Sequence, residues 1–440
     1  MQKPKSGYKL VNSLFGKSEE IPEEWEMLHL EKLVESYKNG IYKPEEFYGK
    51  GIPNIRMFNI QNGVINKNNV VFLEVTKEEA EDYELIPSDI LINRVNSDYL
   101  VGKSGIVHDN FGPATFESKN IRVRVNQKIC NPEFLNSYFN SKYYFNQILS
   151  YIKTAVAQVT INQDDLNRLL IPVPPLEEQQ KIISILSNVD NLINSYGKAI
   201  ETRKRFKTSL MQILLTKGIG HTKLRKIKTY FGKFEEIPEK WEIEPLGKFV
   251  QILSGNYFEY NEFSDNGIRV LKIDNVMYGK IDWENQTFLP KQYLESHKEL
   301  VLQEGDIILA LNRPITNNET KVAKITKSDS PSILYQRVGK FQFSDKFIDK
   351  DFFYVYLNSP IFKKTLARIL IGSDQPYVKT TELLKQALRL PKNPTEQQKI
   401  ASVLSNVDSK INELESKKIS LEKLKKGLMQ KLLIGQIRVV

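Results

Sequence analysis

The sequence EQQKIISILSNVD at residues 178–190 returns as EQQKIASVLSNVD at residues 396–408 with only two substitutions. A second segment, FGKSEEIPEEWE (15–26), returns as FGKFEEIPEKWE (231–242). The offsets of 218 and 216 residues are nearly equal and close to half of the 440-residue chain, so a whole unit was duplicated. A solenoid would instead repeat roughly every 20–50 residues. We therefore expect two similar modules related by a pseudo-two-fold axis, and a ligand with two-fold character of its own.

Residues 176–217 have the heptad spacing of a long amphipathic helix that pairs with another helix. The stretch contains no proline, Glu177 and Glu178 suit the N-terminal end of the helix dipole, and Gly218 and Gly220 suit its stop. Two heptad positions form the expected seam, one with Ile182, Val189, Tyr196, Arg203 and Leu210, the other with Leu186, Ile193, Ile200, Lys207 and Leu214.

The second copy repeats this design over residues 394–434. Thr395 with Gln398 fits a capping box at its start, and Gly435 fits its end. Its seam is expected at Ile400, Val407, Leu414, Leu421 and Leu428, and at Leu404, Ile411 and Leu432.

Each helix of about 40 residues would be ~60 Å long, which is too long for the interior of one small domain. Two equal seams in one chain are satisfied most simply when they pack together. Because the second globular half lies between them, we expect an antiparallel coiled coil. The alternative is that each helix is a core helix of its own half.

The segments outside the helices indicate mixed α/β bodies. β-rich runs such as NNVVFLEV, DILINRV and NIRVRV are separated by Asn, Gly and Pro turns, and a helical stretch, PEFLNSYFNSKYYFNQILSYI, follows them. The prolines of IPVPPLEE then end the first body, because successive prolines continue neither a strand nor a helix. We predict an α+β fold with two globular domains and two spacer helices, with boundaries at 1–174, 175–218, 219–392 and 393–440.

The two bodies align less well than the two helices. GIPNIRMFNIQNGVI (51–65) matches GIRVLKIDNVMYGKI (267–281), and SDILINR (88–94) matches GDIILALNR (305–313). Between these islands the halves share little. One scaffold therefore carries two different surfaces.

Composition narrows the class of protein. Lys and Arg number 63 against 53 Asp and Glu, a net charge of +10, which favours a polyanionic partner such as nucleic acid. A Lys-rich surface kept for solubility or heat tolerance explains the charge equally well. Cys130 is the only cysteine and the four histidines are scattered, so we expect no disulfide and no metal site. Without a long apolar run or a secretory leader pattern, a cytoplasmic protein away from membranes is expected.

Motifs of catalysis are not found in the sequence. GKSG (102–105) lacks the length and ending of a phosphate-binding loop, and GIG (218–220) is a helix stop. NPEF (131–134) is similar to the Asn-Pro-Pro-aromatic loop of adenine methyltransferases but has Glu133 at the second proline, so we interpret it as a helix start. The expectation is a binding and architectural protein with no catalytic residues.

Two IP-x-x-W-E segments, two variable bodies, two proline-marked exits and two EQQKI helices together resemble the specificity subunit of type I restriction–modification enzymes. The likeness covers essentially the whole chain. The exits IPVPPLEEQQKI (171–182) and LPKNPTEQQKI (390–400) both fit, the second with Asn393-Pro394 in place of the double proline.

This resemblance implies that each body is a target-recognition domain for one part of a bipartite, asymmetric site in double-stranded DNA. It implies that the helices form an antiparallel coiled coil that sets the spacer between the half-sites. It also implies docking of two methyltransferase subunits and, through them, of restriction/translocase subunits. S-adenosylmethionine and ATP would bind to those partners, and no cofactor to this chain.

Candidate DNA contacts are Arg, Lys, Asn and Gln side chains on loops of the bodies, because these match the groups in the major groove. The set is Arg56, Asn59, Gln61, Arg94 and Gln158 in the first body, and Lys272, Asn275, Arg313, Gln375 and Tyr377 in the second. Asn59 matches Asn275, and Arg94 matches Arg313. Such shared residues suit turns or phosphate contacts better than discrimination between half-sites. Gln158 and Gln375 suit structural hydrogen bonds or DNA equally, and Tyr377 is expected in the core.

Basic runs on the helices have two interpretations, a solvated coiled-coil face or a docking surface for methyltransferase subunits. They comprise Arg203, Lys204, Arg205, Lys207, Lys417, Lys418, Lys423, Lys425 and Lys426. For the whole chain, the alternatives to a specificity subunit are an orphan two-headed DNA-binding regulator and a scaffold that binds a small ligand or peptide.

Overall fold

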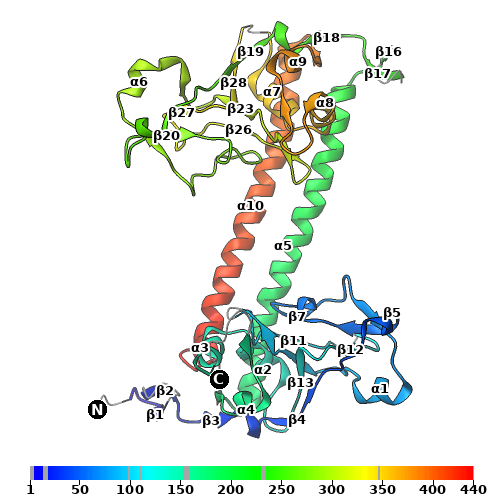
Figure 1. The fold of residues 1–440 in the computed structure, drawn as a ribbon, viewed down its shortest axis with the longest axis vertical. Helices are drawn as coiled ribbons and strands as arrows, with labels where there is room; N and C mark the ends of the chain where they lie inside the picture. The colour runs from blue at the N-terminus through cyan, green and yellow to red at the C-terminus, as the bar shows by residue number, and fades with distance from the viewer. Residues whose placement is uncertain are drawn as a thin grey trace. The chain divides into compact units, whose positions relative to one another are not determined.

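The computed structural model describes residues 4–12, 18–97, 100–108, 111–151, 159–228, 234–344 and 347–439. The chain divides into two compact units. Unit 1 combines Met1–Gly197 with Ser416–Val440, and unit 2 is Lys198–Glu415. Each unit therefore holds one globular body and a part of each of two long helices, α5 and α10 (Figure 1).

The long helices are antiparallel partners within each unit. Helix α5 spans Leu176–Lys217 and α10 spans Pro394–Leu432. Ion pairs between them include Lys204–Glu415 (2.8 Å) and Lys207–Asp408 (2.6 Å) in unit 2, and Lys425–Asp190 (2.7 Å) in unit 1. Within unit 2 the partner number falls as the number along α5 rises, so the helices run in opposite directions. The predicted α+β fold with an antiparallel helix pair is confirmed.

Burial along the seam depends on what lies beside the helix. The most buried seam residues are Ile182, Leu186, Val189, Ile200, Leu214, Ile400, Leu404, Ile411 and Leu432. The half-buried ones are Ile193, Tyr196, Lys207, Leu210, Val407, Leu414, Leu421 and Leu428, and Arg203 is exposed. Towards the ends of the helices, Ile182 and Ile400 belong to the cores of the bodies. The helices are therefore both core helices at their ends and partners of each other in between.

The helix boundaries correct one prediction. Helix α10 begins at Pro394, and the side-chain oxygen of Asn393 accepts the backbone N–H of Thr395 at 3.0 Å. The capping box predicted for Thr395 and Gln398 is therefore wrong, because the cap lies two residues earlier and proline occupies the first helical position. Helix α5 ends at Lys217, and Gly218 follows in the left-handed region (φ 64°), as predicted.

The body of unit 1 is built on two sheets with the orders β4-β13-β9-β11-β7-β6 and β12-β5-β8. Its strands are β1 Tyr8–Asn12, β2 Ser18–Pro22, β3 Glu26–His29, β4 Val34–Asn39, β5 Tyr48–Ile55, β6 Ile60–Gln61, β7 Gly63–Ile65, β8 Val71–Leu73, β9 Ile90–Asn93, β10 Val95–Asn96, β11 Ser104–Ile106, β12 Thr115–Phe116, β13 Asn120–Val125, β14 Val159–Thr160 and β15 Leu170–Val173. Its helices are α1 Lys77–Asp82, α2 Pro132–Phe139, α3 Lys142–Tyr151 and α4 Gln163–Asn167. The predicted helix start at NPEF is confirmed, since Asn131 caps α2.

The body of unit 2 repeats this plan with sheets β19-β28-β23-β26 and β21-β20-β27-β22. Its strands are β16 Leu224–Lys228, β17 Phe234–Pro238, β18 Trp241–Pro245, β19 Val250–Ser254, β20 Ile268–Leu271, β21 Phe288–Leu289, β22 Val301–Leu302, β23 Ile307–Ala310, β24 Ile315–Thr316, β25 Glu319–Thr320, β26 Val322–Lys324, β27 Ser332–Leu334, β28 Val338–Phe343, β29 Leu370–Ile371, β30 Tyr377–Val378 and β31 Ala387–Pro391. Its helices are α6 Tyr293–Ser296, α7 Lys350–Leu357, α8 Pro360–Ile369 and α9 Thr380–Leu384.

Each body has two cores. The larger core joins the body to the helices and contains Trp25 and Ile182 in unit 1, and Trp241 and Ile400 in unit 2. The smaller core lies under the second sheet of each body and contains Phe116 in unit 1. Across the described ranges, no helix is long and apolar enough to cross a membrane.

Candidate nucleic-acid interface

The repeated tryptophan and the repeated Glu-Gln meet in unit 1. Strand β3 pairs antiparallel with β15, which leads into α5. The indole N–H of Trp25 donates to a carboxylate oxygen of Glu178 at 2.9 Å, and both residues are buried. The Gln179 amide donates to the carbonyl of Pro174 at 2.8 Å and accepts the backbone N–H of Asn131 at 2.7 Å. We call this set of contacts the clasp, because it ties the start of the helix to the body.

Unit 2 has the same clasp. Strand β18 pairs antiparallel with β31, and the Trp241 indole donates to a carboxylate oxygen of Glu396 at 3.3 Å. The Gln397 amide donates to the carbonyl of Pro391 at 2.9 Å and accepts the backbone N–H of Asp349 at 2.8 Å. The repeated Trp, Glu and Gln of the sequence are therefore repeated because they make the same contacts twice.

A third partner of the clasp differs between the units. In unit 1 the Arg438 guanidinium donates to both oxygens of Glu178, at 2.7 and 3.0 Å. Burial by itself raises the pKa of Glu178, but hydrogen bonds from Arg438 and Trp25 outweigh it and leave the pKa below its ordinary value. In unit 2, His221 Nε2 lies 2.8 Å from Glu396 Oε1. The segment after α10 thus contacts the clasp glutamate of unit 1, and the segment after α5 contacts the equivalent glutamate of unit 2.

The matching asparagines Asn59 and Asn275 hold the loops that contain them. Asn59 is 2% exposed; its amide accepts the backbone N–H of Arg56 (3.0 Å) and donates to the Asn66 carbonyl (2.9 Å). Asn275 is also 2% exposed and makes the same pair of bonds, accepting from Lys272 N (3.0 Å) and donating to the Asp282 carbonyl (2.9 Å). This geometry agrees with the turn-forming alternative for both residues.

The side chains that flank these asparagines in the sequence are more exposed to solvent than the asparagines themselves. Arg56 is held by Glu117, with 3.1 Å between Nε and the carboxylate, and its guanidinium lies over the exposed Phe58 ring. Gln61 is exposed and donates to the Phe58 carbonyl at 3.3 Å. Lys272 is half-buried and donates to the Thr287 hydroxyl at 2.6 Å. The structure places Arg56 and Asn59 in the loop after β5 and Gln61 in β6 directly after that loop. Lys272 and Asn275 lie in the matching loop after β20.

The matching arginines sit differently in the two units. Arg94 follows β9 and is half-buried, with its Nε atom buried and without a hydrogen-bond partner in the described structure. Arg313 follows β23 in the left-handed region (φ 43°) and is exposed, while its backbone N–H donates to the Pro376 carbonyl at 2.6 Å. Equal positions in the sequence therefore present different surfaces.

Unit 2 gathers three of the candidates at one place. Strands β29 and β30 form a hairpin whose loop carries Gln375, which is exposed, and Tyr377 forms an isolated bridge with Asn312 beside Arg313. Tyr377 is 36% exposed, so the prediction that it lies in the core is wrong: the edge of this two-stranded hairpin leaves its ring open. Gln158, the matching residue of the first half, lies outside the described residues.

A polar cluster that the sequence did not single out lies on the same body. Asn317 and Asn318 form the turn of the β24–β25 hairpin, both in the left-handed region (φ 50° and 61°). The Tyr278 hydroxyl lies 2.7 Å from the Thr316 hydroxyl and accepts the Asn317 amide at 3.0 Å. An Asn-Asn pair between short β-rich runs is the signal that predicts such a turn. The cluster is a set of hydrogen-bonding groups in which Asn317 and Asn318 are exposed and Tyr278 and Thr316 are half-buried.

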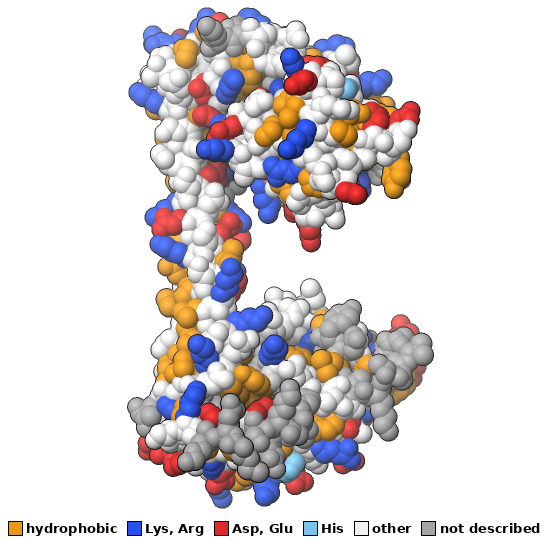
Figure 2. Space-filling view, turned by 90° about the vertical axis from the view of Figure 1, so that its left-hand side faces the viewer, with side chains coloured by type: hydrophobic (Ala, Val, Ile, Leu, Met, Phe, Trp, Pro, Cys, Tyr) orange, Lys and Arg blue, Asp and Glu red, His pale blue; other side chains and the backbone are white. Residues whose placement is uncertain are grey.

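Lys and Arg side chains lie on both units and along the helices, interspersed with Asp and Glu (Figure 2). On the helices, part of this charge serves the pairing itself, since Lys204, Lys207 and Lys425 bind carboxylates of the other helix.

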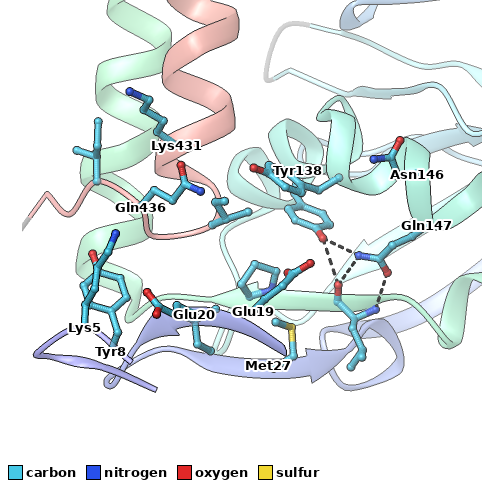
Figure 3. Close-up of a pocket in the computed structure, with 16 residues that line it drawn as sticks. Lys5, Tyr8, Glu19, Glu20, Met27, Tyr138, Asn146, Gln147, Lys431 and Gln436 are labelled. Carbon is cyan, nitrogen blue, oxygen red and sulfur yellow. Dashed lines mark hydrogen bonds between the residues drawn. The ribbon is translucent and has the colours of Figure 1, made fainter. Parts of the chain in front are cut away.

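Unit 1 also contains a cavity of about 630 Å³ between the β1–β2 hairpin, α3 and the tail after α10 (Figure 3). On its wall the Gln147 amide donates to the Tyr138 hydroxyl and to the Leu170 carbonyl, both at 2.8 Å, and accepts the Leu170 N–H at 3.0 Å. Burial raises the pKa of Tyr138. Because these polar groups satisfy one another, the cavity is not our candidate site.

The model of one protein family, described as the type I restriction modification DNA specificity domain, matches residues 22–203 and again 238–423. The two matches cover both bodies and most of both helices. The chain is 38% identical to the type I restriction enzyme MjaVIII specificity subunit of Methanocaldococcus jannaschii, over 95% of this chain and 94% of that protein. It is 30% identical to the putative MjaX specificity subunit of the same organism, over 96% and 95%.

Solved structures are similar in fold at low sequence identity. A chain from a study of complex assembly in the type I R-M system matches with a TM-score of 0.59 and 14% identity, over 95% of this chain and 99% of that chain. The S subunit of a type I system from M. genitalium matches with a TM-score of 0.54 and 15% identity, over 93% and 96%. These likenesses concern the fold alone.

Proposed function

The chain belongs to the family of type I restriction–modification specificity subunits, and from that premise we propose that it reads a bipartite, asymmetric DNA target without catalysing a reaction itself. The observation that supports this proposal is the contrast between frame and loops. The clasp of Trp25, Glu178 and Gln179 returns contact for contact at Trp241, Glu396 and Gln397, whereas the loops held by the two frames differ.

Two different loop surfaces on equal frames suit two different half-sites. Base edges specify a sequence, while phosphate contacts position the protein. In unit 2 the exposed Gln375, Tyr377 and Arg313 and the Asn317 turn offer donors, acceptors and an aromatic ring on one body. In unit 1, Arg56 and Gln61 flank the exposed Phe58. A net charge of +10 supports attraction to the DNA backbone at any sequence.

The partners in this proposal are two methyltransferase subunits and, through them, restriction/translocase subunits. S-adenosylmethionine and ATP belong to those subunits, so this chain supplies only the choice of sequence. The antiparallel helix pair supports a role as the spacer between half-sites. The basic residues of α5 and α10 that remain exposed, such as Arg203 and Arg205, are the docking candidates.

Exchange of one recognition domain tests the proposal. The segment 1–174 is replaced by that of a relative, the chain is expressed with its methyltransferase subunit, and methylated sites are mapped by sequencing. One half of the bipartite methylated motif should change while the other half and the spacer persist. A motif that changed in both halves would contradict independent recognition, and a chain that directed no methylation would contradict the specificity role.

A further inference from the structure

The loop after the first long strand of each body follows the same course in both units. Gly40 follows β4 and donates to the Asn120 carbonyl at 3.0 Å, and Gly255 follows β19 and donates to the Val338 carbonyl at 3.1 Å. The next residues, Ile41 and Asn256, form isolated parallel bridges to Glu117 and Tyr335, which directly follow β12 and β27. Short 3-10 helices then span Glu45–Phe47 in unit 1 and Tyr260–Glu262 in unit 2. The two loops are therefore equivalent from 40 to 47 and from 255 to 262.

Their sequences, GIYKPEEF and GNYFEYNE, share only the glycine and the tyrosine. Packing explains the glycine, because a Cβ atom would lie 2.1 Å from the Glu117 carbonyl oxygen at Gly40 and 2.2 Å from the Tyr335 oxygen at Gly255. Packing explains the tyrosine only in part. The Tyr257 ring lies near the Tyr335 ring, with 6.4 Å between the ring centroids, but both Tyr42 and Tyr257 stay largely exposed. Tyr42 is 79% exposed and Tyr257 is 63% exposed.

Neither tyrosine hydroxyl has a hydrogen-bond partner within the described residues. Tyrosine is enriched among the residues that dominate protein interfaces. Six of the eight loop positions have drifted apart, so two exposed tyrosines at one position indicate a ligand that both units share. The different half-sites of a DNA target do not fit that description.

Two shared ligands remain, the DNA backbone and a protein bound in two copies. The charge of the loops decides between them. Tyr42 is followed by the exposed carboxylates Glu45 and Glu46, and Tyr257 by the exposed Glu259. The one cation of the first loop, Lys43, is paired with Glu79 at 2.6 Å. Carboxylates on the same loop repel phosphates, whereas they attract Arg and Lys side chains, which also bind over tyrosine rings.

We propose that Tyr42 and Tyr257 are equivalent contact residues for two copies of one protein, each of which lays an Arg or Lys side chain between the tyrosine ring and the loop carboxylates. This inference rests on the proposed function, which supplies such a partner in the methyltransferase subunit. It adds a contact on each recognition body to whatever the helices contribute.

The test uses the full-length chain, its methyltransferase subunit and native mass spectrometry to count bound copies. Tyr42→Ala and Tyr257→Ala should each weaken one of the two binding events by tenfold or more, and the double variant should weaken both. Tyr260→Ala is the matched control, since Tyr260 is 94% exposed on the same loop but has Glu45 as its counterpart, and it should bind two copies normally. Tyr42→Phe should keep the affinity, because the ring makes the contact.

The outcomes are distinguishable. If the wild-type chain binds two copies and both alanine variants do so with unchanged affinity, this inference is wrong and the proposed function stands. If the wild-type chain binds none, the proposed function fails and takes this inference with it. A gel shift of the chain alone on a random duplex at low salt gives a further check. Equal DNA affinity is expected for all variants, and a loss confined to Tyr42→Ala and Tyr257→Ala would assign the rings to the DNA backbone instead.

Discussion

Replacing Glu178 by alanine removes the centre of the unit 1 clasp. Glu178 is 4% exposed and accepts from the Trp25 indole and from the Arg438 guanidinium. The substitution leaves the Trp25 N–H buried without an acceptor, at a cost of about 1–3 kcal/mol. It also removes a charged hydrogen bond, which contributes about 1.5–3 kcal/mol.

The lower end of these ranges applies to the arginine. Arg438 is 21% exposed and keeps a second bond, to Glu24 at 2.7 Å, when Glu178 is removed. We therefore expect Glu178→Ala to lower the free energy of unfolding of unit 1 by about 3 kcal/mol. Guanidinium denaturation gives the total, and hydrogen exchange should localise the loss to the start of α5, to β3 and to the tail after α10.

The charge makes part of this loss depend on pH. Because the folded pKa of Glu178 is lowered, its charge stabilises unit 1 above the unfolded pKa of about 4.3. That contribution is lost as the pH falls through the lowered folded pKa. The difference between wild type and Glu178→Ala should therefore shrink below about pH 4, while the part due to the Trp25 N–H persists.

Two further substitutions separate the contributions. Glu178→Gln keeps an acceptor for the Trp25 indole but loses the charge, so it should cost about half as much at neutral pH. That cost should shrink almost to zero below about pH 4, because wild type loses the same charge there. Glu177→Gln changes an exposed neighbour and should stay within about 0.5 kcal/mol of wild type. If Glu178→Ala also stayed within that margin at neutral pH, the clasp would not be what holds the body to the helix.

Three other outcomes are expected. Val189→Asp places a charge at an 8% exposed seam position and should lower the free energy of unfolding of unit 1 by several kcal/mol in a thermal melting assay. Val407→Asp, at a half-buried position, should cost less than half as much. Equal costs for the two variants would argue against this packing. Gly40→Ala should destabilise by about 2 kcal/mol through its contact with backbone, whereas Gly197→Ala, with open space on α5, should stabilise by about 0.5–1 kcal/mol in the same melting assay. Adding seven residues to both helices lengthens them by about 10 Å, or roughly three base pairs, so selection from a randomised-spacer library should yield a longer spacer; an unchanged spacer would show that the joints at the helix starts set the distance.

The sequence alone predicted the features that depend on local pattern. The duplication, the two long helices and their mutual packing follow from heptad spacing and from an offset near half the chain length. The stop at Gly218 and the start of α2 at Asn131 follow from residues whose preferences are local, namely the left-handed glycine and the capping asparagine. The family resemblance also rests on these repeated segments.

The features that depend on contacts between distant residues needed the structure. Trp25 lies 153 residues from Glu178 in the sequence, and Arg438 lies 260 residues from it, so no local pattern predicts their clasp. The same reason explains the errors and omissions at the candidate site. Tyr377 was expected in the core but is exposed because its hairpin lies at an edge. Asn59 is no error, because its buried amide bridges the two sides of its loop and agrees with the turn-forming interpretation.

The equivalence of Tyr42 and Tyr257 is the clearest case. Their offset of 215 residues differs from the offsets of 216 and 218 in the repeated segments, and only one neighbouring glycine matches, so comparison of the halves by sequence did not pair them. Equivalent backbone hydrogen bonds at Gly40 and Gly255 place them together. A heptad pattern and a helix cap are determined by residues a few positions apart, and the sequence contains them directly. The surface that a loop presents is determined by the strands it joins, and only the tertiary structure brings those strands together.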